Sequence, residues 1–546
     1  MKSKDESRLW GATALKVSVG VVVCLLFGGA ISSALAQAGS GVVKLGYVIT
    51  DEEGSRAVNQ KTFDLYEGMG VSLNNFSYFW ENGLGLRADI TNTTLKNRNE
   101  SVSLFKPGLF TLNLHHDRNR RIYDRYANDV VRRERINTSA SLQASKNAEL
   151  FGGFSYNDRS GTVVDIFQFR DDTSSFAVDY QNTTFNVGGR AFNDKGEIRA
   201  EYRRSNYDDN TLSAASRTGD NFNVRGGVRK VGWDRLSASA GYTYRRDKLD
   251  IGVQELETNL GWATARVVLP HNVTATYRFT FGRTTDKNGQ FAETDNARNT
   301  LTIAKSWRGR YGLRLGYENR ISDDLNKRTT SNGLIVGGWV RDAKHFNASG
   351  EFFLRDRNVN NGVTQTGDFT AYRQRVTVKY RDKSWGDVSL HWSGKITTRD
   401  PTLAIRDTLT NPNVETRLDY NVISATTNLR DKEYGALTVT YSYYIGKYNN
   451  NSAENTYEFS DHVVRALIKP SVTDKLYLSA GGSYHRSRRD QDIERFDFEF
   501  EAAYQLAADY SAGMKYSAQT FDDFLFADQF YTGNIVEIYL KKDIQL

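Results

Sequence analysis

The apolar residues of this 546-residue chain recur at every second position over most of its length. In one stretch, Val273, Ala275, Tyr277, Phe279 and Phe281 alternate with Thr and Arg residues. Successive side chains of a β-strand point to opposite faces of a sheet, so this stretch predicts a strand with one apolar and one polar face. The alternation returns in segments 311–317, 376–380, 388–396, 437–445 and 496–501. Apolar residues at helical spacing are almost absent, so the sequence predicts an all-β protein.

A longer repeat groups these strands into pairs. Polar turns begin at Asp342, Asp382, Asp431 and Asp474, which are 40, 49 and 43 residues apart, and an alternating strand follows each of them. Each interval accommodates one hairpin of two antiparallel strands. Extended over residues 37–546, a spacing of about 44 residues predicts roughly 22 to 26 strands. No Pro-rich or Ser-rich linker interrupts the array, so we expect a single domain.

The composition excludes several classes of protein. The chain has 1 cysteine, Cys24, whereas disulfide scaffolds, Cys-based zinc sites and covalently attached haems all need several thiols. It has 5 prolines, and Pro107, Pro270 and Pro470 stand between alternating stretches, where we expect turns. Aromatic residues make up 12%, which argues against disorder. After residue 36, no stretch approaches the roughly 20 apolar residues of a transmembrane helix.

The amino terminus has the parts of an export signal. Residues 2–16 include four basic side chains, residues 17–31 are apolar, and Ala34-Leu-Ala36 matches the small-x-small pattern of a cleavage site. The apolar run is short for a retained anchor helix. We therefore expect residues 1–36 to be a cleaved signal peptide and residues 37–546 to form the mature domain. A mature chain without cysteine suits the oxidising cell envelope.

Two architectures fit such a chain of alternating strands. A soluble β-helix or propeller also repeats, but its strands are shorter and its core is rarely so aromatic. An outer-membrane barrel needs strands of about 9–11 residues with an apolar outer face, a polar inner face and aromatic girdles. Closure of the barrel leaves no strand edge unpaired in lipid. We therefore predict a single large transmembrane antiparallel β-barrel in the bacterial outer membrane.

The chain resembles large bacterial outer-membrane β-barrels over essentially all of residues 37–546. The segment from Tyr531 through Gly533 to Leu540 is similar to their carboxy-terminal insertion signal, although the chain continues to Leu546 and does not end in Phe or Trp. In strand number, Arg/Asp-rich loops and lack of an obvious plug, it looks like the MtrB/PioB family of porin-cytochrome sheaths. That narrower resemblance implies a barrel that encloses a multihaem c-type cytochrome. Many members carry a Cys-x-x-Cys near the mature amino terminus, and this chain has none.

The polar positions of the predicted strands are expected to line the lumen. The candidates are Arg199, Glu201, Arg203, Arg225, Arg229, Arg314, Arg373, Arg375, Lys379, Asp497, Glu499 and Glu501. Opposed basic and acidic walls would set up a transverse field that selects solutes by charge. Alternatively, these residues would form cross-strand salt bridges that hold a wide lumen open. A lumen filled by a protein partner would show the same polar residues.

The sequence gives weaker evidence for other kinds of site. Tyr317, Trp392, Tyr443 and Tyr484 stand towards the ends of predicted strands and are candidates for the aromatic girdle at the membrane interface. His115-His116 is no metal pair, because neighbouring residues of a strand face opposite ways. We therefore expect no metal or cofactor site. No spacing of Ser, His and Asp favours catalysis, and no basic patch favours nucleic acid, so we expect neither an enzyme nor a nucleic-acid-binding protein.

Two functions remain open. The first is a porin-like channel whose charged lumen passes solutes. The second is a sheath for a periplasmic multihaem cytochrome in electron transfer across the outer membrane, with the haems belonging to the partner. Either function implies contact with outer-membrane lipid and with the barrel-assembly machinery. Alternation begins by Val42, so we expect no full plug domain before the barrel.

Overall fold

The computed structural model describes residues 36–54, 66–122, 130–164, 175–211, 216–231, 235–249, 255–288, 293–324, 327–341, 345–360, 365–399, 416–450, 457–490, 492–525 and 530–545. The predicted signal peptide lies outside these residues except for Ala36, at which the first strand begins. In the described part of the chain, no helix is long and apolar enough to cross a membrane.

The described residues form one antiparallel sheet of 26 strands. The first thirteen are β1 (Ala36–Gly54), β2 (Gly68–Trp80), β3 (Gly85–Thr91), β4 (Arg98–Lys106), β5 (Phe110–Ile122), β6 (Val130–Ser145), β7 (Ala148–Val164), β8 (Ser175–Asn193), β9 (Gly196–Asp209), β10 (Arg217–Val231), β11 (Leu236–Leu249), β12 (Glu255–Leu269) and β13 (Val273–Asp286). The others are β14 (Thr294–Trp307), β15 (Tyr311–Asp324), β16 (Lys327–Arg341), β17 (Phe346–Asn360), β18 (Gln365–Asp382), β19 (Gly386–Arg399), β20 (Thr416–Asp431), β21 (Gly435–Asn450), β22 (Tyr457–Thr473), β23 (Leu476–Arg489), β24 (Ile493–Gln505), β25 (Tyr510–Asp523) and β26 (Phe530–Gln545).

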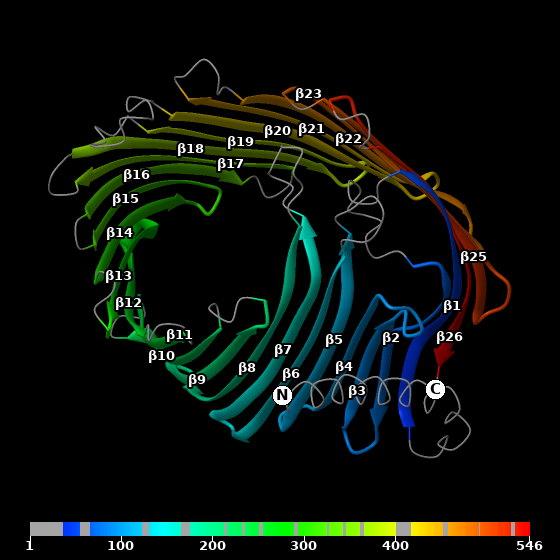
Figure 1. The fold of residues 1–546 in the computed structure, drawn as a ribbon, viewed down its shortest axis with the longest axis horizontal. Helices are drawn as coiled ribbons and strands as arrows, with labels where there is room; N and C mark the ends of the chain where they lie inside the picture. The colour runs from blue at the N-terminus through cyan, green and yellow to red at the C-terminus, as the bar shows by residue number, and fades with distance from the viewer. Residues whose placement is uncertain are drawn as a thin grey trace.

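The sheet closes on itself. β26 pairs with β1 without interruption from Ser40 opposite Gln545 to Gly54 opposite Tyr531, and Figure 1 shows the two strands side by side in the ring. Every other strand pairs with its two neighbours in the chain, so each strand has a partner on both sides. The predicted all-β barrel is confirmed, and its strand number lies at the upper end of the predicted range.

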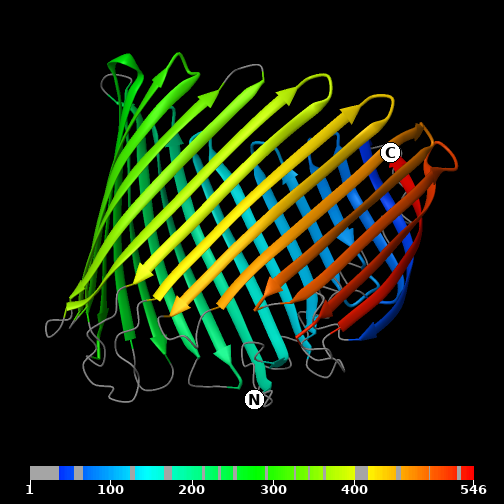
Figure 2. The same ribbon diagram turned by 90° about the horizontal axis from the view of Figure 1, so that it is seen from above.

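The two ends of the barrel differ in their connections. At one end, tight turns such as 146–147, 194–195 and 474–475 join neighbouring strands. At the other end the connections are mostly longer, up to residues 400–415 between β19 and β20. Figure 2 shows the tight turns along the upper edge, on the side of the carboxy terminus. Because outer-membrane barrels have short periplasmic turns and longer extracellular loops, we assign the tight-turn end to the periplasm.

Most strands exceed the expected 9–11 residues. β15 has 14 residues, β7 has 17 and β8 has 19, whereas β3 with 7 and β4 with 9 are short. The strands are steeply tilted (Figure 2), so each needs extra residues to cross a given thickness. The surplus length also indicates that the wall extends beyond the lipid.

The prolines occupy turns in two of the three predicted cases. Pro107 lies between β4 and β5, and Pro270 begins the 3-10 turn Pro270–Asn272 before β13. Pro470 instead lies inside β22, opposite Gly435 of β21. The pairing of β22 with β23 passes from Ile468 to Ser471 without Pro470, so its missing N–H costs no bond to β23.

Candidate functional site

The two faces of the barrel wall differ in chemistry. On β15, the side chains of Leu313, Leu315 and Tyr317 are about half exposed on one face, and Arg314 and Glu318 alternate with them on the other. Charged and polar side chains line the cavities on the wall. A closed wall is concave towards its lumen, so the charged face is the inner face and the apolar face meets lipid.

A ring of tyrosines marks one edge of the outer apolar band. Each hydroxyl bonds to a polar side chain on the next strand, two residues from the tyrosine's own register partner and closer to the extracellular end. The pairs are Tyr202 with Asp220, Tyr242 with Asn259, Tyr277 with Asn299, Tyr317 with Asn332, Tyr441 with His462 and Tyr516 with Asn534. Amphipathic Tyr rings favour the level where lipid meets water. We therefore predict that the outer boundary of the lipid lies at this ring.

Beyond the tyrosine ring the outer face carries ion pairs beside a few exposed aromatic side chains such as Phe281 and Phe496. Arg246 Nε lies 2.6 Å from Glu255 Oε1, and Lys287 Nζ lies 2.8 Å from Glu257 Oε1. Ion pairs of this kind belong in water rather than hydrocarbon. On β15, seven residues follow Tyr317, so the wall rises about 15–20 Å beyond the lipid. We call this part of the wall the collar.

The collar changes the interpretation of the four predicted girdle residues. Tyr317, Trp392, Tyr443 and Tyr484 lie on the outer face, and Tyr443 stacks on His462 with ring centroids 4.6 Å apart. All four stand in the middle of their strands, so the expected position at strand ends was wrong. The strands continue past them because the collar follows. Their role as an interface girdle remains a prediction.

The collar can be located by labelling single cysteines. In a Cys24→Ser background, we expect Asp323→Cys on intact cells to react with a membrane-impermeant maleimide, because this position lies in the collar. Leu315→Cys is expected to stay unlabelled, since the side chain faces lipid. Lys475→Cys, in a periplasmic turn, is expected to react only after the outer membrane is permeabilised. Labelling of Lys475→Cys on intact cells would reverse the assigned orientation.

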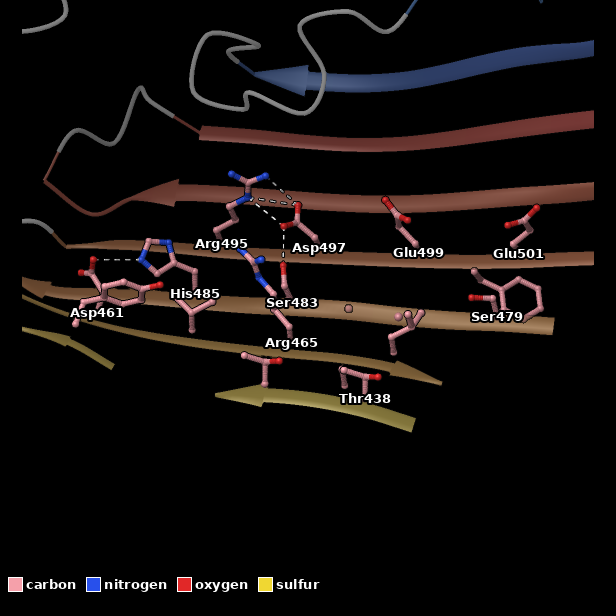
Figure 3. Close-up of a pocket in the computed structure, with 18 of the residues that line it drawn as sticks. Thr438, Asp461, Arg465, Ser479, Ser483, His485, Arg495, Asp497, Glu499 and Glu501 are labelled. Atoms are coloured by element: carbon pink, nitrogen blue, oxygen red, sulfur yellow. Dashed lines mark hydrogen bonds and ion pairs between the residues drawn. The ribbon is translucent and has the colours of Figure 1, made fainter. Parts of the chain in front are cut away.

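The predicted acidic strip lies on β24 and faces a large concavity of about 1040 Å³ (Figure 3). Asp497 is buried and accepts hydrogen bonds from Ser483 Oγ at 2.9 Å and Arg495 Nε at 3.2 Å. Lys515 Nζ lies 3.4 Å from Glu499 Oε2, on the neighbouring strand β25. Each of these two carboxylates therefore has a cationic partner.

The third carboxylate of the strip, Glu501, has its partners two strands away, on β26. Tyr539 of β26 donates its hydroxyl to Glu501 Oε1 at 2.6 Å, across the intervening strand β25. Lys541 Nζ lies 3.9 Å from the same oxygen. In this wall Glu499 and Glu501 thus lie in cross-strand ion pairs, whereas Asp497 pairs with Arg495 of its own strand.

The arginine candidates of β15 and β18 gather around one glutamate, Glu351 of β17. Arg314 forms an ion pair with it, Arg373 Nη2 lies 3.6 Å from Glu351 Oε1, and Arg375 is its register partner. Lys379 lies closer to the periplasmic end, with Nζ 3.1 Å from Asp387 Oδ1. These four candidates are therefore neighbours on the inner wall, remote in strand order from the acidic strip.

The structure brings four of the remaining candidates together. Arg199, Glu201, Arg203 and Arg225 line one cavity with Asn221 and Asn223 of β10. Arg199 Nη2 donates to Glu201 Oε2 at 2.9 Å. Arg229 lies on the same strand as Arg225, four residues closer to the periplasmic end, outside this cavity.

Sequence reasoning missed Glu318, whose side chain bridges three strands. It is 3% exposed, and its carboxylate accepts from Arg298 Nη2 at 2.5 Å and Arg355 Nη2 at 2.7 Å. Arg355 lies on β17 and reaches β15 across Gly333 of β16, which is the register partner of both Glu318 and Arg355. A Cβ at Gly333 would lie 2.9 Å from the Phe353 ring, so glycine makes room for this ring, over which the Arg355 guanidinium lies 5.0 Å from the centroid.

A second bridge repeats this arrangement four residues away. Arg314 of β15 and Glu351 of β17 are both register partners of Gly337, and they pair across it. The signal is present in the sequence: Arg314 and Glu318, Gly333 and Gly337, and Glu351 and Arg355 are each four apart. Only the strand register reveals it.

Both ring nitrogens of His116 also have a carboxylate partner. Its Nδ1 lies 3.0 Å from Glu100 Oε2, and its Nε2 lies 3.1 Å from Glu134 Oε1. An imidazole donates from both nitrogens only when it is protonated, so this geometry calls for the imidazolium form. Such a ring has no lone pair for a metal. Among the described residues, no group of three or more His, Cys, Asp or Glu residues is placed to hold a metal ion.

Comparisons with known proteins bear on the fold. No protein-family model matches the chain, and no curated protein matches it. Among solved structures, it is similar to the FrpB iron transporter from Neisseria meningitidis, with 9% identity and a TM-score of 0.54, over 93% of this chain and 82% of that one. The ferric enterobactin receptor PfeA from Pseudomonas aeruginosa gives 10% identity and a TM-score of 0.50, over 93% and 80%. The siderophore receptor PirA from the same organism gives 8% and 0.48, over 93% and 80%.

At such identities the likeness to FrpB and PfeA shows the fold, which is that of a large outer-membrane barrel. The closed sheet, the apolar outer band and the charged inner face independently meet the requirements of a membrane-spanning barrel. The protein is therefore a bacterial outer-membrane β-barrel. The narrower resemblance to porin-cytochrome sheaths stays a prediction.

Proposed function

We propose that the barrel is a conduit through the outer membrane whose lumen houses a folded partner protein. The observation that carries this proposal is the closed ring of 26 strands. Strands spaced about 4.8 Å apart and tilted by about 40° then enclose a circumference of about 160 Å, or a diameter of about 50 Å. Each wall adds about 5 Å of side chains, which leaves a lumen of about 40 Å.

That width exceeds what solute diffusion needs. Porins of 16–18 strands already enclose an aqueous channel. A folded domain of about 100 residues has a radius of gyration of about 13 Å and thus a diameter of about 34 Å. An open lumen of this size would admit folded domains and abolish the permeability barrier of the outer membrane. A resident partner would close it.

The inner wall supports such a role. Its charges are tied to neighbouring strands by ion pairs, as at Glu318 and Glu351, which makes the wall polar and holds its side chains in place. The resemblance to the MtrB/PioB family suggests a multihaem c-type cytochrome as the occupant. The chain has 1 cysteine, so the haems would belong to the partner. In this proposal the barrel performs no catalysis itself, and it relies on lipid and on the assembly machinery for insertion.

Purification from native membranes tests this proposal. We expect a partner protein to co-purify with the tagged barrel at a fixed stoichiometry and, if it is a multihaem cytochrome, to give the Soret absorbance of c-type haem. In planar bilayers the complex is expected to conduct little, and removal of the partner with high salt is expected to raise conductance. Partner-free barrel with a large steady conductance would refute the proposal.

A solute channel is the second candidate, and one feature of the wall favours it. A patch of the inner face of β4–β7 carries uncharged side chains linked by hydrogen bonds, as between Ser103, Asn113 and Ser139 and between Asn137 and Ser155. This uncharged patch is well hydrated, and nearby charges on the same face lie in ion pairs, such as Arg135 with Asp117 at 3.8 Å, so the patch itself would not retain a charged solute strongly. This candidate predicts high conductance without any partner, so the same purification separates the two.

A further inference from the structure

Three arginines stand in one row across neighbouring strands. Arg190 of β8 is the register partner of Arg199 of β9, which is in turn the register partner of Arg225 of β10. Residues directly opposite each other on one face have Cβ atoms about 5 Å apart, and like charges in such pairs destabilise a sheet. Something must offset this repulsion.

Two of the three arginines, Arg190 and Arg199, have partners that offset this repulsion. Arg190 Nη2 lies 2.7 Å from Glu197 Oε2. Arg199 donates to Glu201 at 2.9 Å and also lies over the Phe151 ring, 4.0 Å from its centroid. Within the described residues, no carboxylate lies within ion-pair distance of Arg225.

A second exposed guanidinium faces the same space. Arg203 lies on β9, four residues from Arg199 on the same face, and it too has no carboxylate in ion-pair distance among the described residues. Arg203 and Arg225 are both exposed to the lumen. With Arg199, two asparagines and Glu201, whose carboxylate is already bonded to Arg199, they line a cavity of about 350 Å³. We call this cavity the arginine pocket.

Guanidinium groups with free N–H donors bind planar carboxylates through paired, charge-assisted hydrogen bonds. We propose that the arginine pocket is a binding site for carboxylate groups, presented in the native complex by an acidic patch on the lumenal partner. The second part rests on the proposed function; the first does not. Bound carboxylates would supply the missing counter-charges of Arg203 and Arg225. The partner would thereby be fixed in one rotational setting, with its acidic side against β8–β10.

A labelled peptide tests the pocket on the purified barrel in detergent. The probe is fluorescein-labelled hexaglutamate, followed by fluorescence anisotropy. We expect Arg203→Gln combined with Arg225→Gln to weaken binding at least about tenfold, because each charge-assisted bond to a carboxylate contributes strongly. The matched control is Arg229→Gln, which removes one charge from the same face of β10 outside the pocket. It is expected to change binding less than about twofold.

Heat-modifiable mobility in gels confirms that each variant is folded. Hexalysine serves as the opposite probe, and the double substitution is not expected to weaken its binding. Unchanged hexaglutamate binding in the double variant would overturn the site. Equal weakening by Arg229→Gln would also overturn it, because a diffuse positive field rather than a pocket would then be responsible.

The partner is tested separately in the native host. Arg203→Glu combined with Arg225→Glu is expected to reduce the co-purified partner at least fivefold relative to wild type. An undiminished partner would refute docking at this pocket. If wild-type barrel binds hexaglutamate and citrate displaces it at millimolar concentration, while no protein co-purifies, the carboxylates are those of a solute. That result would confirm carboxylate binding at the pocket and refute the proposal of a lumenal partner protein.

Discussion

Gly386→Ala is expected to remove most of the folded barrel from the outer membrane. Gly386 begins β19 after a periplasmic turn and has a φ of 131°, in a region that residues with a Cβ rarely adopt. A Cβ at this position would lie 1.9 Å from the carbonyl oxygen of Asn428 on β20. Backbone strain of this kind costs about 1–3 kcal/mol, and the clash with a paired strand adds to it.

The measurement is the fraction of chain that shows heat-modifiable mobility after extraction from outer membranes. The matched control is Gly261→Ala in β12, where a Cβ would meet no atom within 4 Å. This control is expected to accumulate like wild type. If Gly386→Ala also accumulated normally, the turn at residues 383–385 would have to differ from the one described.

The turn before Gly386 belongs to a pattern that explains the sensitivity. Asp382 Oδ1 accepts from the backbone N–H of Ser384, and Asp431 Oδ1 accepts from the N–H groups of Glu433 and Tyr434 in an equivalent turn. Such Asx turns fix the chain reversal, and glycine then resumes the strand. Two of the four aspartates that indicated hairpins in the sequence, Asp382 and Asp431, therefore have a structural role, whereas Asp342 lies outside the described residues.

Glu318→Leu is expected to lower the unfolding temperature of the barrel by about 3 °C. The carboxylate is buried and serves both Arg298 and Arg355, so its removal leaves two guanidinium groups without their partner. Loss of one partner of a buried pair costs about 3–5 kcal/mol. The lower end applies here, because Arg298 is half exposed to the lumen.

The gel-shift midpoint on heating measures this effect. Asp323→Asn is the control, since its pair with Arg328 on the neighbouring strand is largely exposed and contributes little. Leucine at Arg298 and Arg355, added to Glu318→Leu, is expected to restore much of the stability because no charge is then left unpaired. An unchanged midpoint for Glu318→Leu alone would show that water replaces the carboxylate fully.

The wall of the barrel could be predicted from the sequence, because alternation is a local property. Arg199 and Ile198 lie on opposite faces wherever their strand is placed. The bridges at Gly333 and Gly337 could not be predicted, because they depend on the pairing of β15, β16 and β17 in one register. A shift by one residue would put the members of each bridge on opposite faces.

Strand length shows a similar limit. The sequence indicated where alternation holds but not where lipid ends, because collar strands remain hydrogen-bonded and twisted like those in the membrane. Tyr317 was therefore assigned to a strand end although it lies in the middle of β15. The change from Leu315 to Asn319 on one face was the available signal.

The seam between β1 and β26 has a consequence for how the barrel forms. It joins residues 36–54 to residues 530–545, which makes it the pairing of greatest sequence separation in the described sheet. The other strand pairs are hairpins whose partners follow one another in the chain, so they can form early and locally. Until the seam closes, β1 and β26 each present a row of unpaired N–H and C=O groups to the membrane. We therefore expect seam formation to be the last and slowest step of folding, with the growing sheet held open at a single lateral gap.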